Sequence, residues 1–306
     1  MSETINRNIV SGTKWSALTE ISAKISSALV SMILARLLVP EAFGVVASVM
    51  MVISFAQLFA DAGFQKYVVQ HELLPDEKLS EISNVAFWCN FVVSVVATMM
   101  IILFREPLSS LVGCPGLGKV LAVASLSIPL VSFSSVQMSL YRRSFDFKTL
   151  FGVRLVAIVI PIVVTVPLAF LWRSYWALVL GTLLQHTVNA ILLLVLSKWK
   201  PSFGFSFPLL ERMIAFSVWS LIESVSVWLT HTVDMFIVGT TLSQYYLGLY
   251  KTSYVLITQF FCVVTSITNP VLFSSLSRLQ HDREAFLGLF SKFQETVAFF
   301  VFPIGV

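Results

Sequence analysis

Long apolar segments constrain the fold of this chain more than any other feature of its sequence. A run of about 20 apolar residues has the length needed to cross a bilayer as an α-helix. Backbone groups inside a lipid bilayer must be hydrogen-bonded within the protein, which a helix achieves alone. Nine such segments can be counted, at residues 15–39, 42–64, 82–104, 120–141, 151–171, 176–197, 213–240, 246–273 and 286–306. We therefore predict an all-α polytopic membrane protein.

The composition agrees with this class. The chain is 57% hydrophobic and only 12% charged, whereas about 25% of the residues in a soluble domain are charged. The three cysteines, Cys89, Cys114 and Cys262, lie too far apart to suggest a metal site or a disulfide framework. No nucleotide-binding loop, catalytic constellation or metal-ligand spacing is visible. We therefore predict no enzymatic activity, cofactor or metal.

The distribution of basic residues predicts the orientation in the membrane. If the N-terminus is cytoplasmic, the outside loops hold only three basic residues, Arg105, Lys119 and Arg173. The inside segments hold twelve: Arg7, Lys14, Lys66, Lys78, Arg142, Arg143, Lys148, Lys198, Lys200, Arg212, Arg278 and Arg283. Cytoplasmic loops of membrane proteins carry such an excess. We therefore place the N-terminus inside, and attribute the basic pI to orientation and not to nucleic-acid binding.

An internal repeat links the two ends of the chain. Residues 15–48 align without a gap on residues 219–252, a shift of 204 positions. Both copies start with Trp-Ser, continue as an apolar run and end near a glycine, Gly44 in the first and Gly248 in the second. Transporters are often built from such repeats, with the substrate site at the repeat interface. We expect the two copies to form equivalent helix-turn-helix units.

The repeat also predicts the domain organisation. The segment Lys198–Pro208 is rich in helix breakers and precedes the second copy. It therefore separates an N-terminal six-helix bundle, residues 1–208, from the first helices of a pseudo-symmetric second bundle, residues 209–306. A complete second bundle would need six helices, and about three are present. We expect the chain to be a fragment or part of a longer protein.

Several motifs resemble a known transporter family. The stretch Ile33–Gly44, reading ILARLLVPEAFG, resembles the first-loop signature of Wzx-type polysaccharide-lipid flippases, and Asp61-Ala62-Gly63-Phe64 resembles the end of their second helix. Further similar stretches are Arg143–Lys148, Tyr175–Val179 and Gly239–Tyr250. The resemblance extends over nearly the whole chain and is strongest to the colanic-acid exporter branch. It implies a member of the multidrug/oligosaccharidyl-lipid/polysaccharide exporter superfamily.

The first copy of the repeat has a polar face. Glu20 and Lys24 are one helical turn apart on it, and both are candidates for lining a substrate cavity, although they could also simply neutralise each other. The serines on the same face are Ser16, Ser27 and Ser31. Arg36 belongs to the family signature and is a further candidate, with snorkelling to the headgroups as the alternative. Polar faces avoid lipid, so this face should look into the protein.

The second copy and the segment after it supply the other candidates. His231 and Asp234 lie on the polar face of the second copy. Tyr250 and Tyr254 are four residues apart on the next helix, where they could stack on sugar rings or form an aromatic interface belt. Lys251 lies beside them and could reach the interface or the cavity.

The function follows from composition and resemblance together. Composition favours a transporter, and the resemblance implies that its substrate is a polyprenyl-pyrophosphate-linked oligosaccharide, flipped across the cell inner membrane by alternating access. Its partners would be this lipid-linked oligosaccharide and membrane lipid, with a polysaccharide polymerase as a candidate partner protein. Two alternatives remain: a cation-coupled multidrug exporter, for which Glu20, Glu223 and Asp234 would supply acidic groups, and a non-transporting subunit of a polysaccharide assembly complex.

Overall fold

The computed structural model describes residues 18, 22–61, 63–71, 78–144 and 146–258, with eight further positions between 284 and 298. The chain divides into two compact units, residues 1–256 and 257–306. The described positions of the second unit are helical. All contacts discussed below lie within the first unit. Throughout the described ranges the chain forms helices and turns and no strand, so the predicted all-α class is confirmed.

Among the described residues, six helical stretches are long and apolar enough to cross a membrane. In chain order the helices are α2 (Pro40–Asp61), α3 (Phe64–Gln70), α4 (Leu79–Leu103), α5 (Arg105–Leu111), α6 (Gly118–Ser125), α7 (Ser127–Arg143), α8 (Phe147–Ile160), a π-helical turn η1 (Pro161–Thr165), α9 (Val166–Trp172), α10 (Tyr175–Leu196) and α11 (Phe207–Thr241). Residues 22–37 and 244–258 are also helical. The α6–α7 and α8–η1–α9 runs each count as one span.

These six spans confirm the second to seventh predicted segments. Residues 22–37 of the first segment and 246–258 of the eighth are helical, and the ninth lies mostly outside the described residues. One boundary differs clearly, because α11 begins at Phe207 and not near Met213. Pro208 occupies its first turn, where a missing backbone N–H breaks no helical hydrogen bond. The predicted domain boundary at residue 208 stays a prediction.

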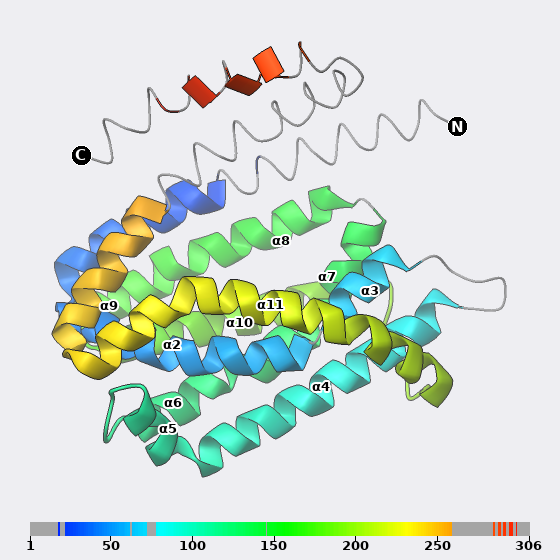
Figure 1. Cartoon of the computed structure of the whole chain (residues 1–306), viewed down its shortest axis with the longest axis horizontal. Helices are drawn as coiled ribbons and strands as arrows, with labels where there is room; N and C mark the ends of the chain where they lie inside the picture. Colours follow the sequence, from blue (N-terminus) through cyan, green and yellow to red (C-terminus); the bar gives the residue numbers. More distant parts are fainter. Residues whose placement is uncertain are drawn as a thin grey trace. The chain divides into compact units, whose positions relative to one another are not determined.

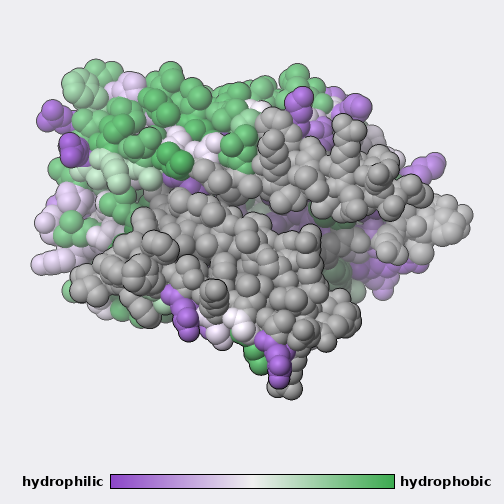
Figure 2. Space-filling view, turned by 90° about the horizontal axis from the view of Figure 1, so that it is seen from above, coloured by the Kyte–Doolittle hydropathy of each residue, from purple (hydrophilic) through white to green (hydrophobic). Residues whose placement is uncertain are grey.

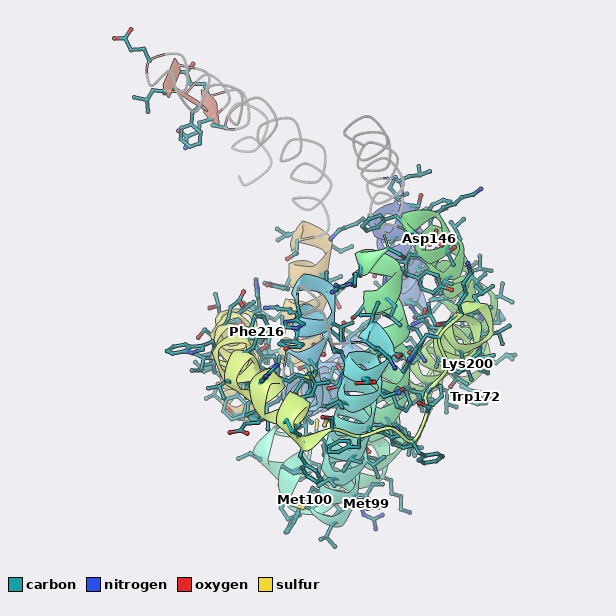
Figure 3. All side chains as sticks on the ribbon, turned by 90° about the vertical axis from the view of Figure 1, so that its right-hand side faces the viewer. Met99, Met100, Asp146, Trp172, Lys200 and Phe216 are labelled. Atoms are coloured by element: carbon teal, nitrogen blue, oxygen red, sulfur yellow. The ribbon has the colours of Figure 1, made fainter. Side chains whose placement is uncertain are left out.

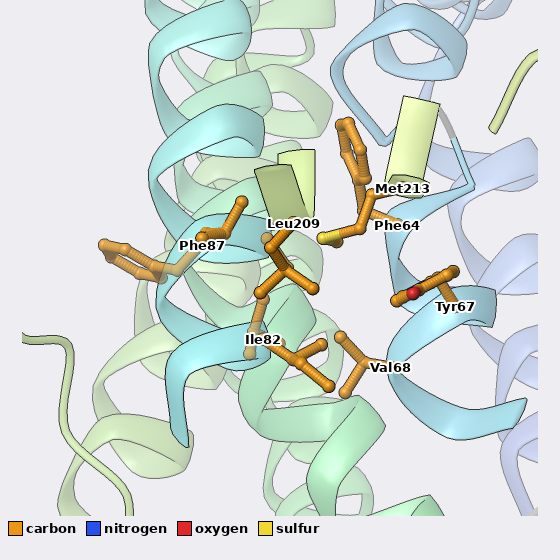
Figure 4. Close-up of a cluster of buried hydrophobic side chains, with 10 residues drawn as sticks. Phe64, Tyr67, Val68, Ile82, Phe87, Leu209 and Met213 are labelled. Carbon is orange, nitrogen blue, oxygen red and sulfur yellow. The ribbon is translucent and has the colours of Figure 1, made fainter. Parts of the chain in front are cut away.

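The start of α11 is fixed to the preceding helices by a buried apolar cluster (Figure 4). Its members are Phe64, Tyr67, Val68, Ile82, Val85, Ala86, Phe87, Val136, Leu209 and Met213. These residues come from α3, α4, α7 and α11. From this anchor α11 runs alongside α2 (Figure 1).

The surface of the first unit has the character expected of a lipid-facing protein. In Figure 2 hydrophobic side chains cover much of the described upper part of one face, while strongly hydrophilic ones gather mainly toward its left and right ends. Met99 and Met100 of α4 point away from the helices in Figure 3, and their exposed fractions are 65% and 52%. Apolar exposure on this scale is unfavourable in water but suits a bilayer.

Candidate functional site

The two copies of the repeat contain the same helix break. The first helix ends at residue 37 and α2 begins at Pro40, while α11 ends at Thr241 and the next helix begins at residue 244. Shifting the first break by 204 positions reproduces the second, as the repeat predicts. Trp15, which opens the first copy, lies outside the described residues.

The two copies touch each other through their closing glycines. A Cβ built on Gly44 would lie 2.0 Å from the backbone oxygen of Gln244, and one built on Gly248 would lie 1.7 Å from that of Pro40. Because Gly44 corresponds to Gly248 and Pro40 to Gln244, the contact is reciprocal. Reciprocal contacts are the mark of a two-fold relation. We call these four residues the glycine contact.

Hydrogen bonds surround the glycine contact. The Gln244 side chain donates from Nε2 to the Gly113 carbonyl oxygen at 2.7 Å and accepts from the Ser48 hydroxyl at 3.3 Å. Gly113 lies between α5 and α6 with φ of 76°, a conformation that favours glycine. Its Cα also packs closely on the backbone of Gly239. Three separate segments of the chain therefore meet at this end of α2.

Five predicted site residues come together between α11 and the helix at 244–258. The Tyr250 hydroxyl donates to Asp234 Oδ2 at 2.5 Å. His231 Nδ1 lies 3.1 Å from the Tyr254 hydroxyl. The rings of Tyr250 and Tyr254 stack with centroids 6.3 Å apart. Lys251 Nζ lies 5.8 Å from the centre of the Tyr254 ring. We call these residues the polar cluster.

Lys251 is the basic group of the polar cluster. Its Nζ donates to Met235 Sδ at 3.6 Å, and a thioether is a weak acceptor. Within the described ranges no carboxylate oxygen lies within 4 Å of this ammonium. Lys251 is seven residues into its helix, about 10 Å from the helix start at 1.5 Å per residue. The cluster therefore combines an ammonium group, whose acceptor among the described residues is a thioether, with two stacked aromatic rings. Such a combination suits an anionic group next to a sugar.

The other three candidates are not joined to the polar cluster. Lys24 is half-buried on the first helix and Arg36 is exposed near its end. Among described residues, no hydrogen bond or ion pair links either side chain to the polar cluster. Glu20, the predicted neighbour of Lys24, lies outside the described residues.

Part of the predicted polar face of the first helix looks into the first bundle. Ser27 and Ser31 line a cavity of about 210 Å³ together with Arg154 of α8 and Gln185 of α10. The serines of this face therefore help to line a polar space among the first helices, as helix-packing serines often do.

Asp61 has surroundings that the sequence did not indicate. Lys66 follows Asp61 by five residues in the sequence, but its Nζ lies 2.7 Å from Glu223 Oε2 of α11. Asp61 instead lines a separate cavity with residues of α4, α7 and α11. Its neighbours come from distant parts of the chain, so no local spacing could have identified them.

Comparisons with known proteins agree with the resemblance seen in the sequence. Residues 33–306 match a family described as polysaccharide biosynthesis protein. No solved structure gives a match.

Three curated relatives are similar over most of this chain. The succinoglycan biosynthesis transport protein ExoT of Rhizobium meliloti (strain 1021) is 28% identical over 92% of this chain and 56% of its own length. An uncharacterized membrane protein in the cps region of Klebsiella pneumoniae is 22% identical over 96% and 60%. The lipopolysaccharide biosynthesis protein WzxC of Escherichia coli (strain K12) is 21% identical over 98% and 60%. The chain thus spans less than two thirds of these relatives.

Proposed function

Since the chain belongs to the polysaccharide biosynthesis protein family, we propose that it forms part of a transporter that moves a polyprenyl-pyrophosphate-linked oligosaccharide across the inner membrane. The observation that carries the proposal is the similarity over 92% of the chain to a relative named as a succinoglycan biosynthesis transport protein. The relative named as a lipopolysaccharide biosynthesis protein supports the same substrate class. A polysaccharide polymerase would then act on the product in the outer leaflet.

The physical problem for such a transporter is the polar and anionic head of the substrate. A sugar and a pyrophosphate are strongly disfavoured in hydrocarbon, whereas the lipid tail can remain in the bilayer. The polar cluster offers Lys251 to the anion and two tyrosine rings to the sugar. The glycine contact holds the two repeat copies together at one end, and its opening would separate the two copies on that side. This is the rocking motion of alternating access.

The multidrug alternative needs acidic groups that are free to attract a cationic drug. Of the acidic candidates, Glu223 is paired with Lys66 at 2.7 Å and Asp234 accepts a hydrogen bond from Tyr250. The polar cluster also contains a lysine. These contacts favour an anionic substrate over a cationic one.

Deleting the gene tests the proposed function. We expect the lipid-linked oligosaccharide to accumulate in the cytoplasmic leaflet and the surface polysaccharide to be lost, because the flipping step is blocked. Drug susceptibility should stay unchanged. Increased drug susceptibility with normal polysaccharide would support the multidrug exporter. A defect in polymerisation with normal flipping would support the non-transporting subunit.

Cysteine labelling tests the proposed orientation. The experiment uses a chain without Cys89, Cys114 and Cys262 and adds one cysteine, at Ser110 after α4 or at Gly204 before α11. Both positions are exposed. We expect a membrane-impermeant maleimide to label Ser110→Cys in intact cells and Gly204→Cys only after permeabilisation, because basic residues concentrate on the Gly204 side. Labelling of Gly204→Cys in intact cells would reverse the assignment.

The native cysteines have to be removed even where they are poorly reactive. Cys114 lies between α5 and α6, and its exposed fraction is 2%. Burial raises the pKa of the Cys114 thiol, which lowers the fraction of reactive thiolate. Slow labelling of Cys114 could otherwise be mistaken for labelling of the nearby Ser110→Cys.

A further inference from the structure

A second polar cavity lies away from the polar cluster, where α2 ends. Its volume is about 310 Å³. It lies between α2, α4, α7 and α11, and its polar lining includes Asp61, Asn90, Ser132, Ser135 and Ser224. Trp228 forms part of the wall and donates from Nε1 to the Ser54 hydroxyl at 2.9 Å.

Two oxygens of this lining are buried and have no hydrogen-bond partner among the described residues. They are Asp61 Oδ1 and Ser132 Oγ. The exposed fraction of Ser132 is only 5%, so solvent outside the cavity does not reach it. A buried polar atom without a partner costs about 1–3 kcal/mol, and more if it is charged. Nearly all such atoms in native proteins therefore have a partner, which here must come from inside the cavity.

Neighbouring side chains hold the end of α2 in place but form no hydrogen bond with Asp61 Oδ1 or Ser132 Oγ. With its amide oriented so that nitrogen faces the carbonyls, Asn90 donates to Ala60 O at 2.9 Å and to Asp61 O at 3.3 Å. The Ser135 hydroxyl donates to Ser132 O at 2.8 Å. Gln65 approaches the Asp61 carboxylate through its side chain and backbone. The site is thus built rigidly around the free carboxylate oxygen.

No cation of the described residues is in direct contact with the Asp61 carboxylate. Asp61 is the last residue of α2, and the C-terminal end of a helix carries about half a negative charge. Lys66 and Arg142 act on this carboxylate from a distance, and Lys66 is itself paired with Glu223. In the described part of the chain no basic group lies within 4 Å of Asp61. The charged form of a carboxylate in this position is unfavourable unless a cation or a proton binds to it.

The donor set selects the type of cation. All the candidate ligands are oxygens of carboxylate, hydroxyl and amide groups, which suit a hard cation. One carboxylate balances one positive charge, so a divalent ion would leave an uncompensated charge in a buried place. The described residues contain no group of three His, Cys, Asp or Glu side chains that could hold a metal. Water molecules have room in the cavity to complete the coordination shell.

We propose that this cavity binds an alkali-metal cation between Asp61 and Ser132. Carbonyl-rich helix C-termini coordinate such ions in other membrane proteins. Because Ser224 and Trp228 of α11 line the same cavity, the bound cation also strengthens the contact between α11 and α2. The proposal concerns binding alone and does not rest on the proposed function.

The test measures binding to the purified protein in lipid nanodiscs at constant pH and ionic strength. NaCl is titrated against N-methyl-D-glucamine chloride, with the unfolding temperature and the tryptophan fluorescence as readouts. We expect Na⁺ to raise the unfolding temperature, because a ligand that binds only the folded state stabilises it. The fluorescence should change in parallel, and Trp228→Phe should remove that change while the thermal shift stays.

Variants at the site separate cation binding from a general salt effect. Asp61→Asn should weaken the apparent affinity for Na⁺ roughly 100-fold or more, because it removes the balancing charge. Ser132→Ala should weaken it about tenfold, which gives a second route if Asp61→Asn folds poorly. Ser94→Ala is the matched control, because the Ser94 hydroxyl is fully buried on α4 and already donates to Phe91 O at 2.7 Å. The apparent affinity of the Ser94→Ala protein for Na⁺ should be unchanged.

Three results would overturn the proposal. One is an equal unfolding temperature in the two salts. Another is a Na⁺ response that persists in both Asp61→Asn and Ser132→Ala. The third is a stability that depends on pH but not on Na⁺, which would mean that Asp61 binds only a proton. None of these outcomes depends on whether the protein exports an oligosaccharide.

Discussion

Replacing Gly248 by alanine in the native gene is expected to reduce surface polysaccharide at least about tenfold. The new Cβ would lie 1.7 Å from the Pro40 carbonyl oxygen and 3.0 Å from the Gly44 nitrogen. Both are backbone atoms of α2, so a side-chain rotation cannot relieve the clash. Overpacking typically costs about 1–3 kcal/mol, and 1.4 kcal/mol is a tenfold change in a conformational equilibrium. The state with the glycine contact closed would therefore be depleted.

Gly44→Ala should have a similar effect, because its Cβ would lie 2.0 Å from Gln244 O. The two substitutions disrupt one contact, so their combination should be less than additive. Gly152→Ala is the matched control. Gly152 is also helical, but a Cβ there meets nothing within 4 Å, and alanine favours the helix. Export is measured as polysaccharide per amount of membrane-inserted protein. Normal export by both Gly44→Ala and Gly248→Ala would show that the contact is not needed.

The sequence predicted the repeat but not the contact that the repeat makes. Gly44 and Gly248 were visible as matching ends of two similar runs. That they touch each other depends on how α2 and the helix at 244–258 cross, which the sequence of either helix does not specify. Glycine was the available signal, because it is the residue that permits the closest approach of two helices.

The polar cluster was predicted as separate residues on two helices. The spacing placed His231 and Asp234 on one face of α11, and Tyr250 and Tyr254 on one face of the next helix. Their meeting follows from the short break at 242–243, which makes the two helices antiparallel neighbours. Residues equally far from this break then lie opposite each other, as His231 and Tyr254 do. This step could have been made from the sequence once the break was located.

The surroundings of Asp61 could not have been predicted in the same way. The sequence shows an acidic residue near a lysine, which is an ordinary surface pair. In the structure Lys66 forms an ion pair with Glu223. Asp61 instead lines a cavity together with Asn90 of α4 and Ser132 of α7. Single polar residues in apolar helices have no periodicity that reveals which of them face each other. Only the packing of α2, α4 and α7 brings them together.

Lys251→Gln is expected to reduce export by about tenfold or more. A hydrogen bond to a charged group is worth about 1.5–3 kcal/mol, and Lys251 supplies the one ammonium group of the polar cluster, beside the imidazole of His231. Glutamine keeps most of the length and polarity but removes the charge. Lys148→Gln serves as the control, because Lys148 is an exposed lysine at the start of α8 and away from the cluster. Its export should stay near that of the unmodified protein.

The single variant leaves one ambiguity, because removing Lys251 also makes the cluster net negative through Asp234. A negative cluster would repel a pyrophosphate even if Lys251 never touched it. The double variant Asp234→Asn with Lys251→Gln removes both charges and keeps a polar side chain for the Tyr250 hydroxyl. If Lys251 only balances Asp234, the double variant should export normally. If Lys251 binds the anion, export should remain low although the protein inserts in normal amounts. We expect the second result, because the carboxylate of Asp234 already accepts a hydrogen bond from Tyr250, while the acceptor of the Lys251 ammonium among the described residues is a thioether.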